Sequence, residues 1–369
     1  MKKINLICSI LFFIVVASSC TKIEGIDQDL SFLNSVNSSN LDKIFDISTD
    51  NSGIVKITPT GEGVATYTIG FGHGTGTTAT TTVAPGGTVS YAYPEGSYTV
   101  TIIATDLAGK STTTTYPLAI TYRAPENVTI TIDADMVVSA TALYANSFLV
   151  YYGDVANEVG TPLAAGAKLA AHTYLPGGPY DLKVVALSGG AAKTEVVKTL
   201  YGLPLTFESP TVNYTFGTFG TGQKFDKVAN PDASGLNTSA TVGKFTRGDE
   251  GWSGTYSPLD IPINFAQGKK IHVMVYNPDP LLIGKKVNAE LESAVGGKPA
   301  NGIAVKRATI TKSGVWEELV FDFSTFTAAE IPLNTRFNQI VLRYNVTVAG
   351  PVVGGAGTIL YIDNISFTN

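Results

Sequence analysis

Two glutamates stand two residues apart in the segment AELES, Glu290 and Glu292. On a β-strand this spacing places both carboxylates on one face, about 7 Å apart. Paired carboxylates are the groups that hydrolyse glycosidic bonds. The same pattern is also typical of a solvated or sugar-facing strand surface. The pair therefore leaves two hypotheses open, cleavage of a glycan and contact with one.

Other catalytic motifs are absent from the sequence. It contains no GxSxG, no HExxH, no P-loop and no GxGxxG between a strand and a helix. The three histidines, His73, His172 and His272, are far apart along the chain, so no two can share a metal through sequence proximity. We therefore predict a protein without enzymatic activity.

The composition predicts an all-β protein of several domains. The chain has 369 residues, enough for about two to four domains. Only 15% of the residues are charged, and 38 glycines and 18 prolines suit strands joined by tight turns. A net charge of -5 without a basic patch argues against a nucleic-acid partner.

The first twenty residues have the three parts of an export signal. Two lysines precede an apolar run over 4–16, and the small residues 17–19 follow it. The apolar run is shorter than the about 20 residues that a permanent membrane span needs. Because the small residues lead directly into Cys20, the segment resembles a bacterial lipoprotein signal peptide over 1–20. An uncleaved anchor and an ordinary secretory signal are the alternatives.

The lipoprotein resemblance implies that Cys20 becomes the first residue of the mature chain and carries acyl groups that hold it in a membrane. The other cysteine, Cys8, lies inside the signal. The mature chain then has no thiol for a disulfide, a metal site or a nucleophile. The following stretch, 21–42, is rich in Ser, Asn and Asp and is expected to be a flexible tether.

Two segments after the tether repeat each other. YTIGFGHG and SYAYPEGSYTVTIIATDLAG form one copy, and FLVYYGDV and AAHTYLPGGPYDLKVVALSGG form the other. Each copy alternates apolar and polar residues between glycines, as in a small β-sandwich. The tyrosine strands resemble the PKD family, although His73 stands where that family expects Asp. The resemblance implies spacer domains of PKD/Ig type over 43–122 and 123–203, with His73 and His172 as packing or turn residues.

The sequence pattern changes after Leu203, and the new pattern continues over 204–369. Strand-like segments such as KKIHVMVYN, KVNAELESA, WEELVFDFS, FNQIVLRYNV and TILYIDNISF are spaced by turn residues. They predict a β-sandwich of jelly-roll type. One face of several strands is apolar, and the other presents polar groups. These polar residues include His272, Glu290, Gln339 and Arg343. If the strands share a sheet, these groups form one shallow hydrogen-bonding surface.

Two aromatic residues stand in the glycine-rich segment GDEGWSGTYSP, Trp252 and Tyr256. A protein that binds a sugar commonly offers it a platform of aromatic rings, because the C–H face of a pyranose is apolar while its rim carries hydroxyls. We predict that these two side chains form it; the alternative is a tryptophan that caps its own sandwich. Strand parity also favours exposure of Trp316, although a tryptophan at the start of a strand often folds over a core edge.

The order of motifs across 204–369 resembles the carbohydrate-binding domains of surface glycan-binding lipoproteins from polysaccharide utilisation loci of Bacteroidota. The motifs are FES, NPDASGLNTSATVGKF, GWSGTYS, VWEELVFDFS and LYIDNISF. The resemblance implies capture of a polysaccharide, with a β-glucan of laminarin type (β-1,3-glucan) favoured. It also implies delivery to a neighbouring outer-membrane importer from the cell surface, where Cys20 anchors the chain.

In related modules a glutamate of the first strand and an aspartate of the last hold a structural calcium ion, which the resemblance carries onto Glu208 and Asp363. Oxygen ligands suit Ca²⁺, although Asp363 and Asn364 are equally suited to turn hydrogen bonds. Two rivals to glycan capture remain open. One is a glycan-active enzyme that uses Glu290 or Glu292, and the other is an adhesion or scaffold protein that binds an outer-membrane protein.

Overall fold

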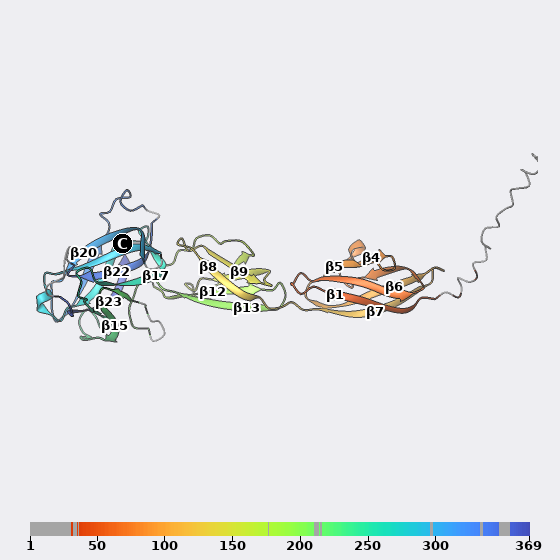
Figure 1. Ribbon diagram of the computed structural model, residues 1–369, viewed down its shortest axis with the longest axis horizontal. Helices are drawn as coiled ribbons and strands as arrows, with labels where there is room; N and C mark the ends of the chain where they lie inside the picture. Colours follow the sequence, from red (N-terminus) through yellow and green to blue (C-terminus); the bar gives the residue numbers. More distant parts are fainter. Residues whose placement is uncertain are drawn as a thin grey trace, which may run out of the picture. The chain divides into compact units, whose positions relative to one another are not determined.

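The structure is a computed structural model of the chain (Figure 1). It describes Ser31, Ser35, residues 37–175, 177–209, 214, 216–295, 298–332, 335–346 and 355–369, with the side chains of 295 and 298–303 left out. The predicted signal peptide with Cys20 and most of the predicted tether lie outside these residues. No helix in the described part is long and apolar enough to cross a membrane.

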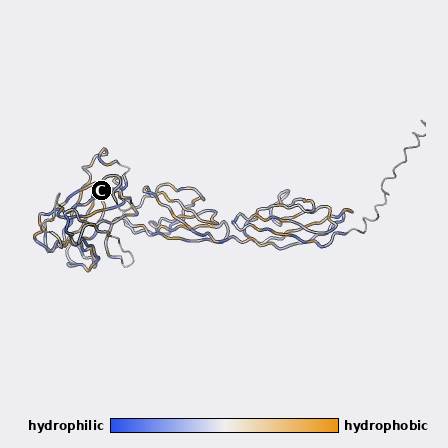
Figure 2. Tube along the Cα trace, in the orientation of Figure 1, coloured by the Kyte–Doolittle hydropathy of each residue, from blue (hydrophilic) through white to orange (hydrophobic). Residues whose placement is uncertain are grey.

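The prediction of an all-β fold is confirmed, because the regular elements are strands apart from short 3-10 turns. The chain forms two compact units, Met1–Arg123 and Ala124–Asn369. Hydrophilic and hydrophobic residues are interspersed along the strands of both units (Figure 2). This alternation buries one face of each sheet against its partner sheet.

The first unit is a sandwich of a three-stranded and a four-stranded sheet. The strand orders are β1-β2-β5 and β4-β3-β6-β7. Alternate residues of β2 and β6, such as Val55, Ile57, Val100 and Ile102, are buried in the shared core. The elements are β1 (Ser39–Ile47), β2 (Ile54–Glu62), β3 (Val64–Gly70), η2 (Gly76–Thr78), β4 (Thr80–Val83), β5 (Val89–Ala92), β6 (Gly96–Asp106) and β7 (Ser111–Ile120).

The second unit begins with a smaller sandwich that repeats this arrangement. It pairs a four-stranded sheet in the order β11-β10-β12-β13 with the hairpin β8-β9. Their shared core includes Phe148, Val150 and Val184. The elements are β8 (Glu126–Ile132), β9 (Val138–Leu143), β10 (Ser147–Tyr151), β11 (Thr161–Ala164), β12 (Tyr180–Leu187) and β13 (Lys193–Leu200).

One buried hydrogen bond recurs in both repeats and explains why the tyrosines recur. The Tyr93 hydroxyl donates to the carbonyl of Phe71 at 3.0 Å, and the Tyr174 hydroxyl donates to the carbonyl of Tyr152 at 3.1 Å. Both tyrosine side chains are buried, so the bond satisfies a hydroxyl that water cannot reach.

The two histidines of the repeats hold turns by side-chain hydrogen bonds. His73 Nδ1 lies 3.0 Å from the Tyr91 hydroxyl. In the second copy His172 stacks on Tyr152, with ring centroids 3.7 Å apart, and its Nε2 lies 2.8 Å from Asp154 Oδ2. Both histidines therefore have local packing partners.

The rest of the second unit is a sandwich of two five-stranded antiparallel sheets, which we call the front sheet and the back sheet. The front sheet has the order β14-β17-β22-β19-β20 and the back sheet β15-β16-β23-β18-β21. Between them lies a core that includes Val273, Leu291, Phe321, Ile340 and Ile362. The front strands are β14 (Gly217–Phe219), β17 (Gly254–Asn264), β22 (Arg336–Tyr344), β19 (Lys286–Val295) and β20 (Lys298–Thr309). The remaining elements are β15 (Lys224–Ala229), β16 (Thr241–Thr246), β18 (Lys270–Tyr276), η3 (Pro280–Leu282), β21 (Trp316–Asp322) and β23 (Ile359–Thr368).

Gly153 offers a test of the repeat geometry. Its φ is +79°, and an added Cβ would lie 2.5 Å from the carbonyl oxygen of Asp181. Gly166 is a matched control in the same repeat, because its φ is +76° but no atom lies within 4 Å of an added Cβ. We expect Gly166→Ala to cost about 1–2 kcal/mol from backbone strain alone, and Gly153→Ala to cost clearly more. Calorimetric unfolding measures both; equal losses would contradict the close approach to Asp181.

Candidate functional site

The face of the front sheet that points away from the core collects polar and aromatic side chains from four strands. Residues paired across neighbouring strands share a face. Phe219 pairs with Gly254, and Tyr256 of β17 pairs with Val341 of β22, which in turn pairs with Glu290 of β19. We call this surface the front face. Its described residues include Gly217, Phe219, Gly254, Tyr256, Pro258, Asn288, Glu290, Glu292, Gln339, Val341 and Arg343.

Two glycines make room for the aromatic rings of this face. A Cβ on Gly254 would lie 2.7 Å from both the Phe219 ring and the Arg343 side chain. A Cβ on Gly217 would overlap the ring of Tyr256. The missing side chains therefore let Phe219 and Tyr256 lie flat across neighbouring strands.

Three aromatic rings form a patch at the β14 side of the front face. The indole of Trp252 is parallel to the Phe219 ring, with an interplanar angle of 2° and centroids 6.2 Å apart. Phe219 also neighbours Tyr256, at 6.4 Å. Trp252 is 53% exposed. Phe219 thus neighbours both Trp252 and Tyr256. Tyr256 stands on β17 and not in a loop; that these two rings form a platform for a sugar stays a prediction.

The loop that carries Trp252 is held by hydrogen bonds to the segment before β15. The Asp249 amide donates to the Thr221 carbonyl at 2.8 Å, and the Glu250 carboxylate accepts from the Thr221 amide at 2.6 Å and from its hydroxyl at 2.7 Å. The Gly248 amide donates to Gln223 Oε1 at 2.9 Å. Because these bonds hold residues 248–250 and β17 begins at Gly254, the indole is presented from an ordered backbone.

A buried arginine supports the base of the same loop. Arg247 is 1% exposed and donates to the carbonyls of Tyr344, Asn345 and Gly248 at 3.1, 3.0 and 3.4 Å. Burial lowers the pKa of its guanidinium below the usual range. These bonds connect the end of β16 to the end of β22.

Beside the aromatic patch, charged and amide groups form a network at the base of the face. Arg343 Nη2 lies 2.7 Å from Glu290 Oε2, and the guanidinium stands 5.2 Å from the centre of the Phe219 ring. Asn288 Nδ2 donates to Glu290 Oε1 at 3.2 Å. The arginine therefore connects the carboxylate network to the aromatic patch.

Glu292 lies two residues along β19 from Glu290 and pairs with Gln339 of β22. It accepts a hydrogen bond of 2.6 Å from Gln339 Nε2, and it is 4% exposed. Burial raises the pKa of the Glu292 carboxyl, and the charge of Glu290 adds to the rise. The predicted pair thus consists of one carboxylate in an ion pair and one carboxyl with a raised pKa.

Two polar atoms near the patch lack a hydrogen-bond partner within the described part of the chain. They are the Nε of Arg343 and the hydroxyl of Ser253, both buried. Ser253 stands between Trp252 and the first residue of β17. Unpaired buried polar groups are rare and often mark a site that a water molecule or ligand completes.

The prediction that His272 shares this surface is wrong. His272 lies on β18 of the back sheet, on the other side of the core from Glu290. There its ring nitrogens lie 3.0 Å from Glu318 Oε1 and 2.9 Å from the Thr368 hydroxyl. The alternation of apolar and polar residues predicts which side chains leave the core, but not which of two sheets a strand joins.

The predicted exposure of Trp316 is also wrong. Trp316 points away from the core of the sandwich, as its parity predicts, but it is only 3% exposed. Its indole packs in a small cluster with Met274 and Tyr276, and its Nε1 donates to the carbonyl of Asp232 at 2.7 Å. The segment between β15 and β16 contacts it there, so Trp316 is not a platform for a ligand.

Glu208 and Asp363 lie near each other at the segment that precedes β16. Glu208 Oε1 accepts from the Thr241 amide at 2.7 Å, and Asp363 Oδ2 accepts from Asn237 Nδ2 at 2.9 Å. Asp363 is fully buried, and burial raises the pKa of its carboxyl, with a further rise from the charge of Glu208. A cation bound by both carboxylates would offset the cost of burying the charge of Asp363 and the repulsion between Asp363 and Glu208. The donor chemistry therefore fits Ca²⁺.

The other ligands of such an ion would have to be neutral oxygens. No group of three or more His, Cys, Asp or Glu side chains that could hold a metal gathers in the part of the chain that the structure covers. Asp363 Oδ1 accepts from the Asn364 amide at 2.8 Å, so the predicted turn hydrogen bond is present as well.

Sequence reasoning missed Phe219, the ring on which the aromatic patch is built. It stands in FGTFGTG, on a strand of three residues that is too short to show a period. The signal that could have found it is the row of glycines on both sides, because a large ring between glycines has no neighbouring side chains to bury it.

No family model matches the chain, and no curated protein matches it. Solved structures give distant similarity. A carbohydrate-binding module studied for the promiscuous specificity of the β-sandwich superfamily is 14% identical, with a TM-score of 0.27; the match covers 90% of this chain and 98% of that one.

Two further structures show the same level of similarity. SGBP-B from a complex xyloglucan utilization locus in Bacteroides uniformis is 12% identical, with a TM-score of 0.30, and the match covers 89% of this chain and 98% of that one. The CBM22-2 xylan-binding domain of Paenibacillus barcinonensis Xyn10C is 17% identical, with a TM-score of 0.31, and the match covers 44% of this chain and 96% of that one.

The two tryptophans should respond differently to truncation. We expect Trp316→Ala to lower the free energy of unfolding by about 3–5 kcal/mol, because it removes a buried ring and a hydrogen bond. Trp252→Ala should cost about 1 kcal/mol or less, because its ring is half exposed. Urea unfolding followed by circular dichroism tests this; a reversed order would contradict the assigned burial.

Proposed function

We propose that the protein captures a polysaccharide on the front face without cleaving it. The observation that carries this proposal is the aromatic patch, in which Trp252 is exposed and Phe219 and Tyr256 are half-buried, beside a network of carboxylate, amide and guanidinium groups. The rings offer an apolar surface to the C–H face of a sugar. The carboxylates and amides of the network are buried and paired with one another, so they support the guanidinium of Arg343, whose side chain is 22% exposed and suits a sugar hydroxyl.

The binding free energy that the aromatic rings can supply is sufficient for capture at a surface. Covering about 100 Å² of apolar ring surface contributes on the order of 2.5 kcal/mol. The loop of Trp252 is already tied to Thr221, so little conformational entropy is lost when a sugar stacks on it. A chain anchored to a cell surface also holds its ligand at a raised effective concentration, so that modest affinity serves.

The finer proposals on ligand and location rest on the motif resemblance. It favours a β-glucan, with laminarin-type β-1,3-glucan first, and a neighbouring outer-membrane importer as the recipient. It also favours lipid anchoring through Cys20 at the outer surface of the outer membrane. In this arrangement the two N-terminal sandwiches act as spacers.

Hydrolysis is the second candidate function, and one observation favours it. Glu292 has a raised pKa and lies near Glu290, which contacts Arg343. Two carboxyl groups in different environments are typical of glycosidase acids. Against it, both carboxylates are 4% exposed and already occupied, Glu290 by Arg343 and Glu292 by Gln339. Release of reducing sugar that Glu292→Gln abolishes would establish the enzyme in place of capture.

The proposal is tested by affinity electrophoresis of the chain from residue 21 on. The native gels contain laminarin, mixed-linkage glucan, xylan, mannan or alginate. We expect one polymer to retard the wild type and Trp252→Ala to abolish the retardation, because the indole is the most exposed ring of the patch.

His272→Ala is the matched control, since it removes a ring from the back sheet and should leave the retardation unchanged. Retardation in none of the gels would contradict glycan capture. Co-purification of a stable complex with an outer-membrane protein would then favour the adhesion or scaffold alternative.

We propose in addition that Glu208 and Asp363 bind a structural calcium ion. The raised pKa of Asp363 means that the folded chain without metal loses stability as the pH rises from about 4 through that pKa, because the buried carboxyl must then ionise. Calcium should remove this cost. The gain in stability from Ca²⁺ should therefore be full at neutral pH and fade as Asp363 becomes protonated in acid.

Thermal unfolding with and without Ca²⁺ measures the effect. At a free concentration of about 100 Kd, the expected stabilisation is about 3 kcal/mol. It should vanish in Asp363→Asn and persist in Asp226→Asn, which alters an exposed aspartate of the same sheet. A melting temperature that ignores Ca²⁺ at neutral pH would contradict the ion.

A further inference from the structure

The front face continues beyond the aromatic patch toward the preceding sandwich, because strand β17 is irregular there. Pro258 pairs with Gln339, and the pairing resumes only at Ile263 with Phe337. Residues 259–262 of β17 are thus opposed by the single residue Asn338. This large bulge bends the strand away from the ladder.

The bulge is the element on which the second sandwich docks. The Ile261 amide donates to the Tyr201 carbonyl at 2.9 Å, and the Tyr201 amide donates to Asp260 Oδ2 at 3.1 Å. The side chain of Ile261 packs against the core of the second sandwich. Tyr201 follows β13 of that sandwich directly in the chain, yet two hydrogen bonds attach it to the C-terminal sandwich.

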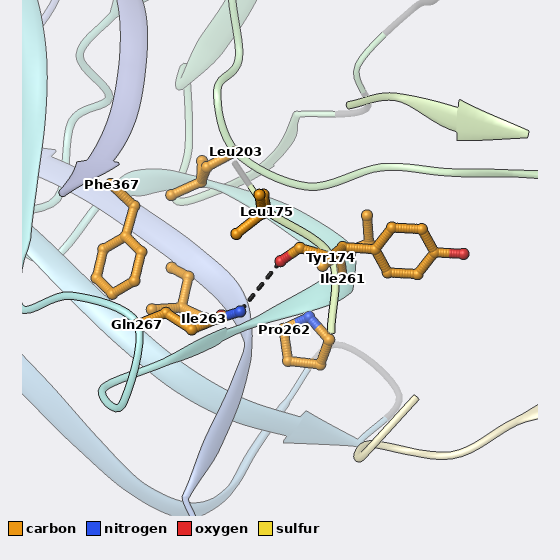
Figure 3. Close-up of a pocket in the computed structure, with 8 residues that line it drawn as sticks. All are labelled: Tyr174, Leu175, Leu203, Ile261, Pro262, Ile263, Gln267 and Phe367. Carbon is orange, nitrogen blue, oxygen red and sulfur yellow. Dashed lines mark hydrogen bonds between the residues drawn. The ribbon is translucent and has the colours of Figure 1, made fainter. Parts of the chain in front are cut away.

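Further contacts hold this joint. Gln267 Nε2 donates to the Tyr174 carbonyl at 3.0 Å, beside a small pocket whose lining includes Leu203 and Ile261 (Figure 3). Arg336 Nε lies 3.2 Å from Asp135 Oδ1. The position of Tyr201 relative to the front face is therefore set by several contacts between the two sandwiches.

A hollow of about 290 Å³ lies between Tyr201 and the front face. Its lining includes Tyr201, Tyr214, Pro258, Asp260 and Asn338. Pro258 belongs to the front face, two residues along β17 from Tyr256, so the hollow adjoins the patch directly. The rings of Tyr201 and Tyr214 meet edge to face, with centroids 5.8 Å apart and an interplanar angle of 70°.

The chemistry of the hollow matches that of the patch. It has two aromatic rings, and Asp260 is an exposed carboxylate. One oxygen of Asp260 accepts from the Tyr201 amide, and the other makes no hydrogen bond to a described residue. A hydroxyl-rich chain that stacks on a ring and donates to a carboxylate suits this hollow better than an apolar peptide does.

We propose that this hollow is a distal subsite of the glycan-binding face and that the second sandwich contributes Tyr201 to it. The inference rests on the proposed function, which it deepens. From Trp252 to Asp260 the chain spans at most about 26 Å, at about 3.3 Å per residue of strand. The full face therefore takes an oligosaccharide of several sugars, and a short one occupies the patch alone.

Isothermal titration calorimetry of the chain from residue 21 on tests the subsite, with laminaritriose and laminariheptaose as probes. The wild type should bind the heptasaccharide more tightly than the trisaccharide. Tyr201→Ala should weaken heptasaccharide binding about fivefold, the size expected when one aromatic face leaves a sugar, and should leave the trisaccharide unchanged.

Two further variants separate recognition from support of the joint. Tyr201→Phe keeps the ring and should bind both probes as the wild type does. Tyr201→Leu keeps apolar bulk at the joint without an aromatic face and should behave like Tyr201→Ala. Trp252→Ala should weaken binding of both probes.

The outcomes distinguish the two proposals. If the wild type prefers the heptasaccharide and Tyr201→Ala and Tyr201→Leu keep the full preference, the subsite is wrong while glycan capture stands. If Tyr201→Leu binds the heptasaccharide normally and only Tyr201→Ala fails, Tyr201 acts by packing, and the subsite is again wrong. If the wild type binds neither probe, the subsite and β-1,3-glucan capture fail together.

Discussion

The guanidinium of Arg343 and the carboxylate of Glu290 form an ion pair on the outward side of the front sheet, where both groups are largely removed from water. A buried pair of this kind adds little net stability, yet removal of one partner leaves an unpaired charge and costs about 3–5 kcal/mol. The pair links β22 to β19. Because the same guanidinium lies beside the Phe219 ring, the pair also supports the base of the aromatic patch.

The patch depends on this support because it is built across strands. Phe219, Trp252 and Tyr256 come from a three-residue strand, a loop and a long strand, and Gly217 and Gly254 clear the space between them. Hydrogen bonds between Thr221 and both the Asp249 amide and the Glu250 carboxylate fix the loop. The side chains of a face held in this way are already ordered in the folded chain. Binding of a flexible polymer therefore costs little further conformational entropy of the protein.

The sequence was sufficient to predict strands, turns, the tandem repeat and an all-β sandwich, because these follow from local alternation and glycine spacing. The sequence also predicted one shared surface for Trp252, Tyr256, Glu290, Gln339 and Arg343. It placed His272 there wrongly, because the alternation of apolar and polar residues shows that a side chain leaves the core but not which of the two sheets carries it. It could not show that the segment at Asp232 contacts Trp316, because that contact joins residues more than eighty positions apart. Phe219 and Tyr201 depend in the same way on long-range pairing.

The account is tested most directly by iodide quenching of tryptophan fluorescence in the wild-type chain, with and without laminarin. The chain has 2 tryptophans, and Trp252 is half exposed while Trp316 is buried, so iodide should reach only the first. If the front face holds the polysaccharide, saturating laminarin should protect the quenchable fraction. Undiminished quenching under conditions in which laminarin retards the chain in a gel would mean that the polymer binds elsewhere, and would contradict the assignment of the front face.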